Sequence, residues 1–239
     1  MKQNKHLAFS KTETKTYSYP EDFINKIICG DCLEVMKDIP DNSVDLIFFD
    51  PPYNQKKDYG VYKDNLTDEN YEKFIKKVLK EVRRISNNKL SVFISNKLTR
   101  FFWNLIPDSH LIIIKKFGTS APHNNYYVTW HPLLTNIKPN ENIYDLWEDV
   151  RLPGEGYFFR EERFDNPGFT SQKLTEYVVR YFSQENQIIL DPFLGSGTTA
   201  VACKKLNRRF IGIEINPEYC KIAEERLKKV PKRLDKFVV

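Results

Sequence analysis

The residues best suited to chemistry are Asp50, Pro51, Pro52 and Tyr53, which directly follow the apolar run V-D-L-I-F-F at 44–49. Two consecutive prolines lack N–H donors and restrict the residue before them, so the run must end at Asp50 in a rigid, extended turn. That turn presents a carboxylate, a carbonyl and an aromatic ring. At the carboxyl end of a parallel strand, these groups could bind a small planar polar group. A plain exit from strand to loop is the alternative for this stretch alone.

A second stretch, D-P-F-L-G-S-G-T-T-A at 191–200, follows the apolar residues 188–190. It predicts a strand that turns through two glycines into a helix, as in nucleotide-type cofactor sites, where glycines let a ligand approach the backbone. The next predicted strand ends in Glu214, which lies 19 positions after Gly195 (214 − 195). An acidic residue at a spacing of about 20 typically binds ribose hydroxyls. The two features together indicate a cofactor that contains adenosine.

The charges of this second stretch favour a cofactor without phosphates. Asp191 stands at the predicted strand tip, where a carboxylate would attract an ammonium group. No Gly-Lys-Ser/Thr sequence that would bind phosphates follows it. S-adenosylmethionine combines adenosine with a positive amino group and has no phosphates, so we expect it as the cofactor.

Alternating strands and helices must position these two stretches. Runs of β-prone residues occur at 26–29, 44–49, 90–94, 111–114, 187–190 and 209–213, and helical spacing of apolar residues occurs at 33–39, 67–86, 98–105, 170–182, 198–206 and 217–229. This alternation predicts an α/β fold with a Rossmann-like, doubly wound and mostly parallel sheet that helices cover on both faces.

The length of 239 residues favours one large domain, here residues 23–239. Residues 1–22 are polar and aperiodic, which predicts a flexible amino-terminal arm. From about 119 to 168, prolines break the pattern and aromatic residues and arginines are interleaved, which predicts a small insert. Such residues could stack on bases and bind phosphates, and an aromatic mini-core under a surface loop is the alternative.

Composition excludes several classes of protein. No apolar run is long enough to span a bilayer and no signal-peptide core is present, so we expect a cytoplasmic protein. The net charge of +5 with local groups of Lys and Arg suits a polyanion or simply solvated helix faces. Cys29 and Cys32 form a C-x-x-C without a second pair. We therefore expect buried or incidental thiols and no metal site.

With both stretches in hand, the sequence resembles the S-adenosylmethionine-dependent DNA amino-methyltransferases, and specifically their circularly permuted β group. In that group the catalytic D-P-P-Y comes first, a target-recognition region follows and the cofactor loop comes last. The resemblance covers most of residues 26–226 and rests on five elements in the family's order: residues 30–33 (G-D-C-L), 50–53 (D-P-P-Y), 170–173 (T-S-Q-K), 191–199 (D-P-F-L-G-S-G-T-T) and 212–215 (G-I-E-I). It implies a class I methyltransferase fold with a recognition insert.

The resemblance also implies roles for individual residues. Asp31 would receive the amino group of the cofactor's adenine, and Glu214 the ribose hydroxyls. Lys173 would lie near the carboxylate of the methionine part, although Leu174 stands where family members often have proline. The remaining residues that would hold the methionine part are Asp191, Phe193, Gly195, Ser196, Gly197 and Thr198.

For catalysis, the family implies that Asp50 and the Pro51 carbonyl each accept one N–H of the target amine while Tyr53 stacks on the base. Because an amine inside duplex DNA is out of reach, the base would be flipped out. An aspartate at position 50 favours adenine N6 as the target, whereas serine is common in the cytosine-N4 subgroup. Cytosine-N4 methylation and a catalytically silent nucleic-acid-binding subunit of the same fold are the alternatives. The partner is double-stranded DNA, and because the insert is short for this group, a homodimer or a partner subunit would contribute to recognition.

Overall fold

A computed structural model describes residues 17–56, 61–62, 64–118, 127–140 and 172–231 of the chain. Its centre is a seven-stranded sheet in the order β1-β7-β6-β2-β3-β5-β4. Strands β1, β7, β6, β2 and β3 run parallel to one another, and β5 runs antiparallel to both of its neighbours, β3 and β4. The strands are β1 (Lys26–Cys29), β2 (Leu46–Phe49), β3 (Leu90–Phe93), β4 (His110–Gly118), β5 (Tyr127–Thr135), β6 (Ile188–Asp191) and β7 (Arg209–Glu214).

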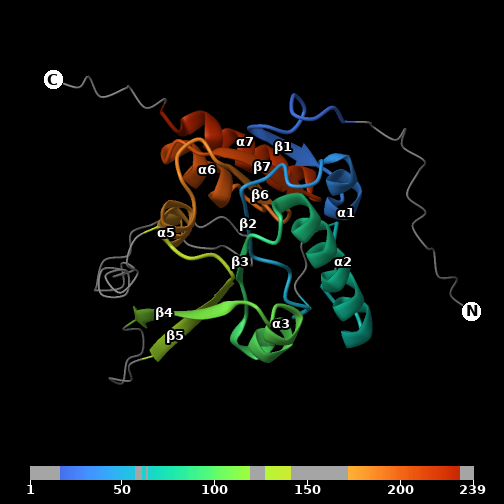
Figure 1. The fold of residues 1–239 in the computed structure, drawn as a ribbon, viewed down its shortest axis with the longest axis vertical. Coiled ribbons are helices and arrows are strands. Elements are labelled where there is room, and N and C mark those ends of the chain that lie inside the picture. The colour runs from blue at the N-terminus through green and yellow to red at the C-terminus, as the bar shows by residue number, and fades with distance from the viewer. Residues whose placement is uncertain (1–16, 57–60, 63, 119–126, 141–171, 232–239) are drawn as a thin grey trace, which may run out of the picture.

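Helices cover both faces of this sheet, with α1 and α2 on one side of the view in Figure 1 and α5 and α6 on the other. The helices are α1 (Cys32–Val35), the 3₁₀ turn η1 (Met36–Asp38), α2 (Asp68–Ser86), η2 (Asn96–Leu98), α3 (Thr99–Leu105), α5 (Gln172–Phe182), α6 (Thr198–Lys205) and α7 (Pro217–Lys229). This arrangement confirms the predicted doubly wound, mostly parallel sheet. The predicted start of α5 at residues 170–171 lies outside the described residues.

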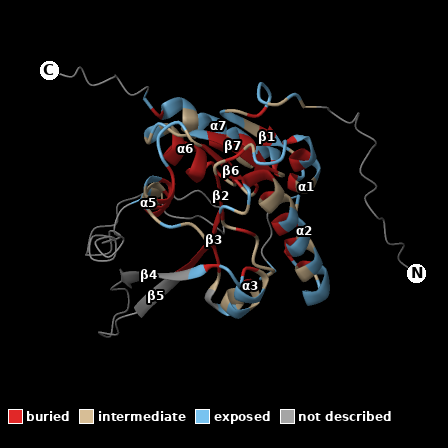
Figure 2. Ribbon diagram, viewed as in Figure 1, coloured by how far each residue is buried: buried red, intermediate tan, exposed pale blue. Residues whose placement is uncertain are grey.

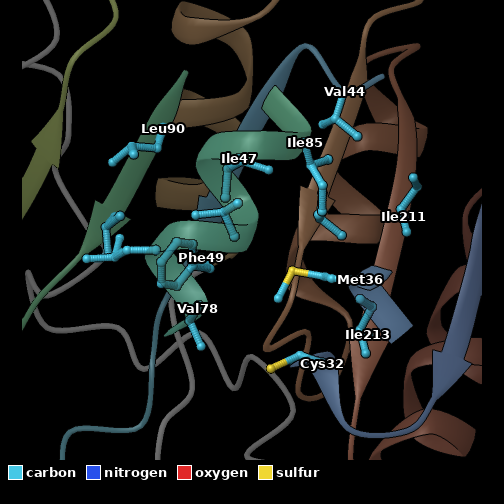
Figure 3. Packing of buried hydrophobic residues seen from close by; sticks show 14 of the residues in the cluster. Cys32, Met36, Val44, Ile47, Phe49, Val78, Ile85, Leu90, Ile211 and Ile213 are labelled. Carbon is cyan, nitrogen blue, oxygen red and sulfur yellow. The ribbon is translucent and has the colours of Figure 1, made fainter. Parts of the chain in front are cut away.

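Strand β2 is buried on both faces because its side chains alternate between two apolar cores. Ile47 and Phe49 of β2 belong to the core shared with α1 and α2, which Figure 3 shows from close by. Leu46 and Phe48 belong to the core shared with α5 and α6. All four side chains are at most 2% exposed. A continuous apolar run is the pattern that a strand buried between two helical layers requires.

Helix α2 shows how local sequence sets an element's ends. Thr67 caps it, since its hydroxyl accepts the N–H of Asn70 at 3.3 Å, and Asn87 ends it in the left-handed conformation at φ 50°. Its apolar residues are buried against the sheet while its other face is exposed to solvent (Figure 2). Both ends agree with the sequence prediction.

Strand β5 is a part of the sheet that the sequence pattern did not predict, since it lies within the range 119–168 taken as an insert. Pro132 cannot donate to a ladder and therefore argues against a strand with two neighbours. In the structure, Pro132 lies opposite Ile113, and its carbonyl accepts the N–H of Ile94 at 3.0 Å. Residues 119–126 and 141–168 of the predicted insert lie outside the described residues.

Two further findings concern the amino-terminal residues and the possibility of a membrane-spanning helix. Residues 1–16 of the predicted arm lie outside the described residues, whereas Tyr17 and Tyr19 pack on Phe23, which is fully buried. None of the helices in the described part of the chain has the length and apolar character that crossing a bilayer requires.

The order of the strands places a crevice between β6 and β2. These two strands are parallel neighbours, so the loops that follow them leave the sheet at the same edge. Helix α6, which follows β6, packs on one face, and α2, which follows β2, packs on the other. Ligands of open α/β sheets bind at such a switch point.

Candidate active site

A pocket lies at the carboxyl edge of the sheet, where the loops after four strands converge. Each loop contributes residues that the sequence singled out: Asp31 after β1, Asp50 after β2, Gly195 after β6, and Glu214 at the end of β7. The complete lining consists of Gly30, Asp31, Cys32, Asp50, Pro51, Pro52, Tyr53, Tyr62, Phe74, Pro192, Phe193, Gly195, Glu214, Ile215 and Tyr219. The two stretches predicted to carry chemistry therefore share one pocket.

The turn after β2 is held by side chains on both sides. Within it, the hydroxyl of Tyr53 donates a hydrogen bond to Oδ1 of Asp50. From α2, the hydroxyl of Tyr71 donates to the carbonyl of Pro52 at 2.8 Å. These bonds fix a carboxylate and an aromatic ring next to each other at the wall of the pocket.

Glu214 connects the end of β7 to the glycine turn after β6. Its Oε2 accepts the N–H of Gly195 at 2.7 Å and its Oε1 accepts the N–H of Asn216 at 2.8 Å. The side chain is only 8% exposed, and this burial raises the pKa of the carboxyl group. Each carboxylate oxygen can accept a second hydrogen bond, so Glu214 retains acceptor capacity toward hydroxyl groups in the pocket.

Asp31 lies beside Glu214 at the neighbouring strand end. The carbonyl of Glu214 accepts the N–H of Gly30 at 2.9 Å, and Cys29 is paired with Glu214 in the sheet register. Asp31 caps α1, since its Oδ1 accepts the N–H of Leu33 at 2.8 Å, and it lines the pocket. Asp31 and Glu214 thus both line the end of the pocket formed by β1 and β7.

Asp191 lies at the tip of β6 but is not among the residues that line the pocket. Its oxygens accept bonds from its own loop, from the N–H of Phe193 at 2.9 Å and the hydroxyl of Thr199 at 2.6 Å. Burial raises the pKa of Asp191 to about 7, and the negative charges of Asp50 and Glu214 add to this effect. The three carboxyl groups thus lie near one another at the crevice, and their mutual repulsion disfavours ionisation of Asp191.

The two glycines of the turn serve different purposes. Gly195 lines the pocket at φ 55°. Gly197 has φ 89°, and a Cβ built on it would lie 2.6 Å from the Cβ of Ala223 in α7. Both positive φ values favour glycine. Gly197 is therefore required by helix packing, whereas the sequence suggested that both glycines admit a ligand.

Arg226 of α7 supports the same turn, and no local pattern indicated it. Its guanidinium donates to the Ser196 carbonyl at 2.7 Å, the Ser196 hydroxyl at 3.0 Å and the Thr198 hydroxyl at 3.2 Å. It also donates to the side-chain oxygen of Gln172 in α5 at 3.0 Å. Ser196 and Thr198 are buried beneath the lining and the adjacent Lys173 is exposed, so none of the three lines the pocket.

Aromatic residues missed by the sequence patterns form a further wall. Phe74 of α2 contacts Phe193 with ring centroids 6.1 Å apart, and Tyr62 contacts Phe74 at 6.3 Å. Burial is the largest cause that raises the pKa of Tyr62 to about 12. Phe74 belongs to the apolar face of α2, so its spacing indicated burial, whereas nothing around Tyr62 indicated a site.

Cys32 also lines the pocket. Burial raises the pKa of its thiol, and the described residues contain no disulfide-bonded cysteine. Within those residues, no group of three or more His, Cys, Asp or Glu side chains could hold a metal ion. Besides the Cys32 thiol, the pocket presents carboxylates, backbone groups and aromatic rings.

Family models match both halves of the chain. Residues 1–119 match the D12 class N6 adenine-specific DNA methyltransferases, and residues 116–225 match a family described as DNA methylase. The Type II methyltransferase M.HpaI of Haemophilus parainfluenzae is 30% identical over 235 residues, covering 84% of this chain and 74% of that protein. The DNA adenine methyltransferase YhdJ of Escherichia coli (strain K12) is 27% identical, covering 84% of this chain and 82% of that protein.

A solved structure gives the same result for the fold. The candidate DNA modification methylase TTHA0409 of Thermus thermophilus, in complex with S-adenosyl-L-methionine, superimposes with a TM-score of 0.56 at 26% identity. The match covers 86% of this chain and 95% of that one. The chain therefore belongs to the S-adenosylmethionine-dependent DNA methyltransferases, the family that its sequence resembles.

Proposed function

We propose that this enzyme transfers the methyl group of S-adenosylmethionine to the N6 amine of adenine in double-stranded DNA, by direct attack of a flipped-out base. The observation that carries the proposal is the pocket in which Asp50 and Tyr53 lie together with Glu214 and Gly195. Asp50 and Tyr53 are suited to an amine on an aromatic base, and Glu214 and Gly195 are suited to a nucleoside.

The acceptor amine is a poor nucleophile because its lone pair is delocalised into the ring. Asp50 and the carbonyl of Pro51 each accept one N–H, which redirects the lone pair and stabilises the growing positive charge on nitrogen. The hydroxyl of Tyr53 occupies Oδ1 of Asp50, yet each carboxylate oxygen accepts more than one bond, so acceptor capacity remains. The ring of Tyr53 stacks on the base.

The chain offers matching groups for each part of the cofactor, which supplies an electrophilic methyl group on a sulfonium when it is bound. Asp31 receives the amino group of its adenine, Glu214 accepts from the ribose hydroxyls, and the turn at Phe193 and Gly195 holds the methionine part. Asp191 supports this turn from behind, since it accepts the N–H of Phe193. Ser196, Gly197 and Thr198 belong to the same turn without lining the pocket, and Lys173 keeps the role near the methionine carboxylate that the family resemblance implies. Holding amine and methyl in line is worth roughly 7–11 kcal/mol of the barrier.

Adenine is favoured over cytosine by Asp50 and by the N6 adenine-specific family that residues 1–119 match. Cytosine N4 is the second candidate because it is also an aromatic exocyclic amine. The DNA sequence is read, in this proposal, by residues of the region 119–168 other than β5, together with a second copy or a partner subunit.

One experiment separates these candidates. The purified chain is incubated with S-adenosylmethionine and unmethylated genomic DNA, and the DNA is then digested to nucleosides for mass spectrometry. We expect N6-methyladenine. N4-methylcytosine would instead assign the cytosine activity, and unmodified nucleosides from a protein that binds cofactor and DNA would show a catalytically silent subunit. Sequencing of the modified bases in the same DNA identifies the target site.

A further inference from the structure

Asp64 is a fully buried carboxylate near the catalytic turn that belongs to none of the recognised motifs. Its Oδ1 accepts the backbone N–H of Asn54 at 2.6 Å, and its Oδ2 accepts the backbone N–H of Gln55 at 2.7 Å. Its own carbonyl accepts the N–H of Lys56 at 2.7 Å. Three consecutive N–H groups of the chain after Tyr53 thus end on one residue.

The carboxylate of Asp64 is matched to these backbone donors. Both oxygens serve as acceptors for backbone donors, and hydrogen bonds to a charged acceptor are about twice as strong as neutral ones. Successive N–H groups directed at one point form a binding site for an anion. Asp64 supplies that anion from within the protein.

The backbone that Asp64 holds is unusual. Asn54 and Lys56 have positive φ values of 54° and 61°; asparagine adopts this left-handed region readily, whereas lysine rarely does. The side-chain nitrogen of Asn54 donates to the carbonyl of Leu66 at 2.8 Å, two residues beyond Asp64. Residues 54–56 are therefore fixed against residues 64–66 by side chains from both segments.

This support reaches the reacting groups through a single peptide bond. The N–H of Asn54 follows Tyr53 directly, and the Tyr53 hydroxyl bonds to Asp50. Tyr71 holds the carbonyl of Pro52 from the other direction. The catalytic turn is thus held before Tyr53 by Tyr71 and after it by Asp64.

We propose that Asp64 is a positioning residue for methyl transfer, an inference that rests on the proposed function of Asp50 and Tyr53. It holds the backbone of Asn54 and Gln55 and so keeps the ring of Tyr53 and the carboxylate of Asp50 in place for the target amine. Asp64 does not line the pocket, so it acts on the base through these residues and has no contact with the cofactor.

The test compares Asp64→Asn with Asp68→Asn, an exposed aspartate in the first turn of α2. The amide keeps the volume of Asp64 but presents an NH₂ group to one of the two backbone donors. With DNA and cofactor saturating, we expect Asp64→Asn to lower the rate of methyl transfer by about 10- to 100-fold, as misplacement near 1 Å does. The dissociation constant for the cofactor should stay within about twofold of wild type, and Asp68→Asn should leave both quantities unchanged.

Stability is separated from positioning by measuring every protein at the same interval below its own melting temperature. An unchanged rate in Asp64→Asn, or a loss of rate with an equal loss of cofactor binding, overturns the inference. If Asp64→Asn does not fold, Asp64→Glu, which retains the charge on a longer side chain, serves for the same comparison. Wild-type product is identified first, so a wild type without N6-methyladenine refutes the proposed function, whereas a normal rate in Asp64→Asn refutes only this inference.

Discussion

The carboxylate of Glu214 accepts the backbone N–H of Gly195 at 2.7 Å, although the two residues are 19 positions apart in the chain. This bond fixes the glycine turn after β6 to the end of β7. The residue expected to bind ribose therefore also sets the position of the turn expected to hold the methionine part. Both halves of the cofactor site depend on one carboxylate.

Replacing Glu214 should weaken cofactor binding. Glu214→Gln removes the charge and turns one acceptor into a donor that faces a backbone N–H. Since hydrogen bonds to charged groups contribute about 1.5–3 kcal/mol, the dissociation constant for S-adenosylmethionine should rise by about 10- to 100-fold. Titration calorimetry measures it, with exposed Glu218→Gln as the control. An unchanged dissociation constant would refute the ribose role.

Removing Arg226 should affect the cofactor turn through its support. Arg226→Ala leaves the Ser196 carbonyl and the Thr198 hydroxyl without their guanidinium donor, so the turn should become more mobile. We expect the dissociation constant of the cofactor to rise by about tenfold, since a donor that bonds several groups is lost. Hydrogen exchange should increase at residues 195–198, while exposed Lys228→Ala changes neither. Equal exchange in the two variants would contradict this role.

Asp191 should make stability depend on pH. Its pKa is raised to about 7 by burial, above the value of about 3.9 expected in the unfolded chain. Between these two values the unfolded state has released a proton that the folded state keeps, so the free energy of unfolding falls as pH rises. The contribution of Asp191 is complete below about pH 4 and is lost as pH passes about 7.

Urea denaturation of the cofactor-free protein at pH 5, 6, 7 and 8 measures this effect. The free energy of unfolding of wild type minus that of Asp191→Asn should decline across the series, because the amide does not titrate. Glu214, whose pKa is also raised, is present in both proteins, so most of its own contribution drops out of the difference. A constant difference would show that Asp191 titrates near its ordinary value.

Much of the fold was predictable because hydrophobic periodicity marks elements that are buried between two helical layers. The run at 44–49 belongs to this class, and the helical spacing of apolar residues in α2 marks a helix with one face packed on the sheet. Strand β5 was not predictable, because proline is normally excluded from strands with two neighbours. Pro132 nevertheless lies in a strand that pairs with both β3 and β4, and this pairing compensates for its missing N–H. Local pattern carries no information about such compensation.

The residues of the site likewise fall into those that the local sequence predicted and those that it did not. Asp50 and Glu214 were found because each ends a predicted strand, and strand ends meet at one edge of a parallel sheet. Asp64 and Arg226 were missed because their roles arise from contacts to backbone distant in sequence, for which residue type and spacing give no signal. The sequence singled out Gly197 as a glycine that lets a ligand approach the backbone. In the structure its close neighbour is Ala223 of α7.

The central claim is that the acceptor amine and the cofactor use different residues of one pocket. Asp50→Ala tests it most directly, when methyl transfer to DNA and calorimetric binding of S-adenosylmethionine are measured on the same preparation. We expect transfer to fall below detection, because the amine loses its carboxylate acceptor, while the cofactor's dissociation constant stays within about threefold of wild type. Near-normal transfer by Asp50→Ala, or loss of cofactor binding together with transfer, would contradict the claim.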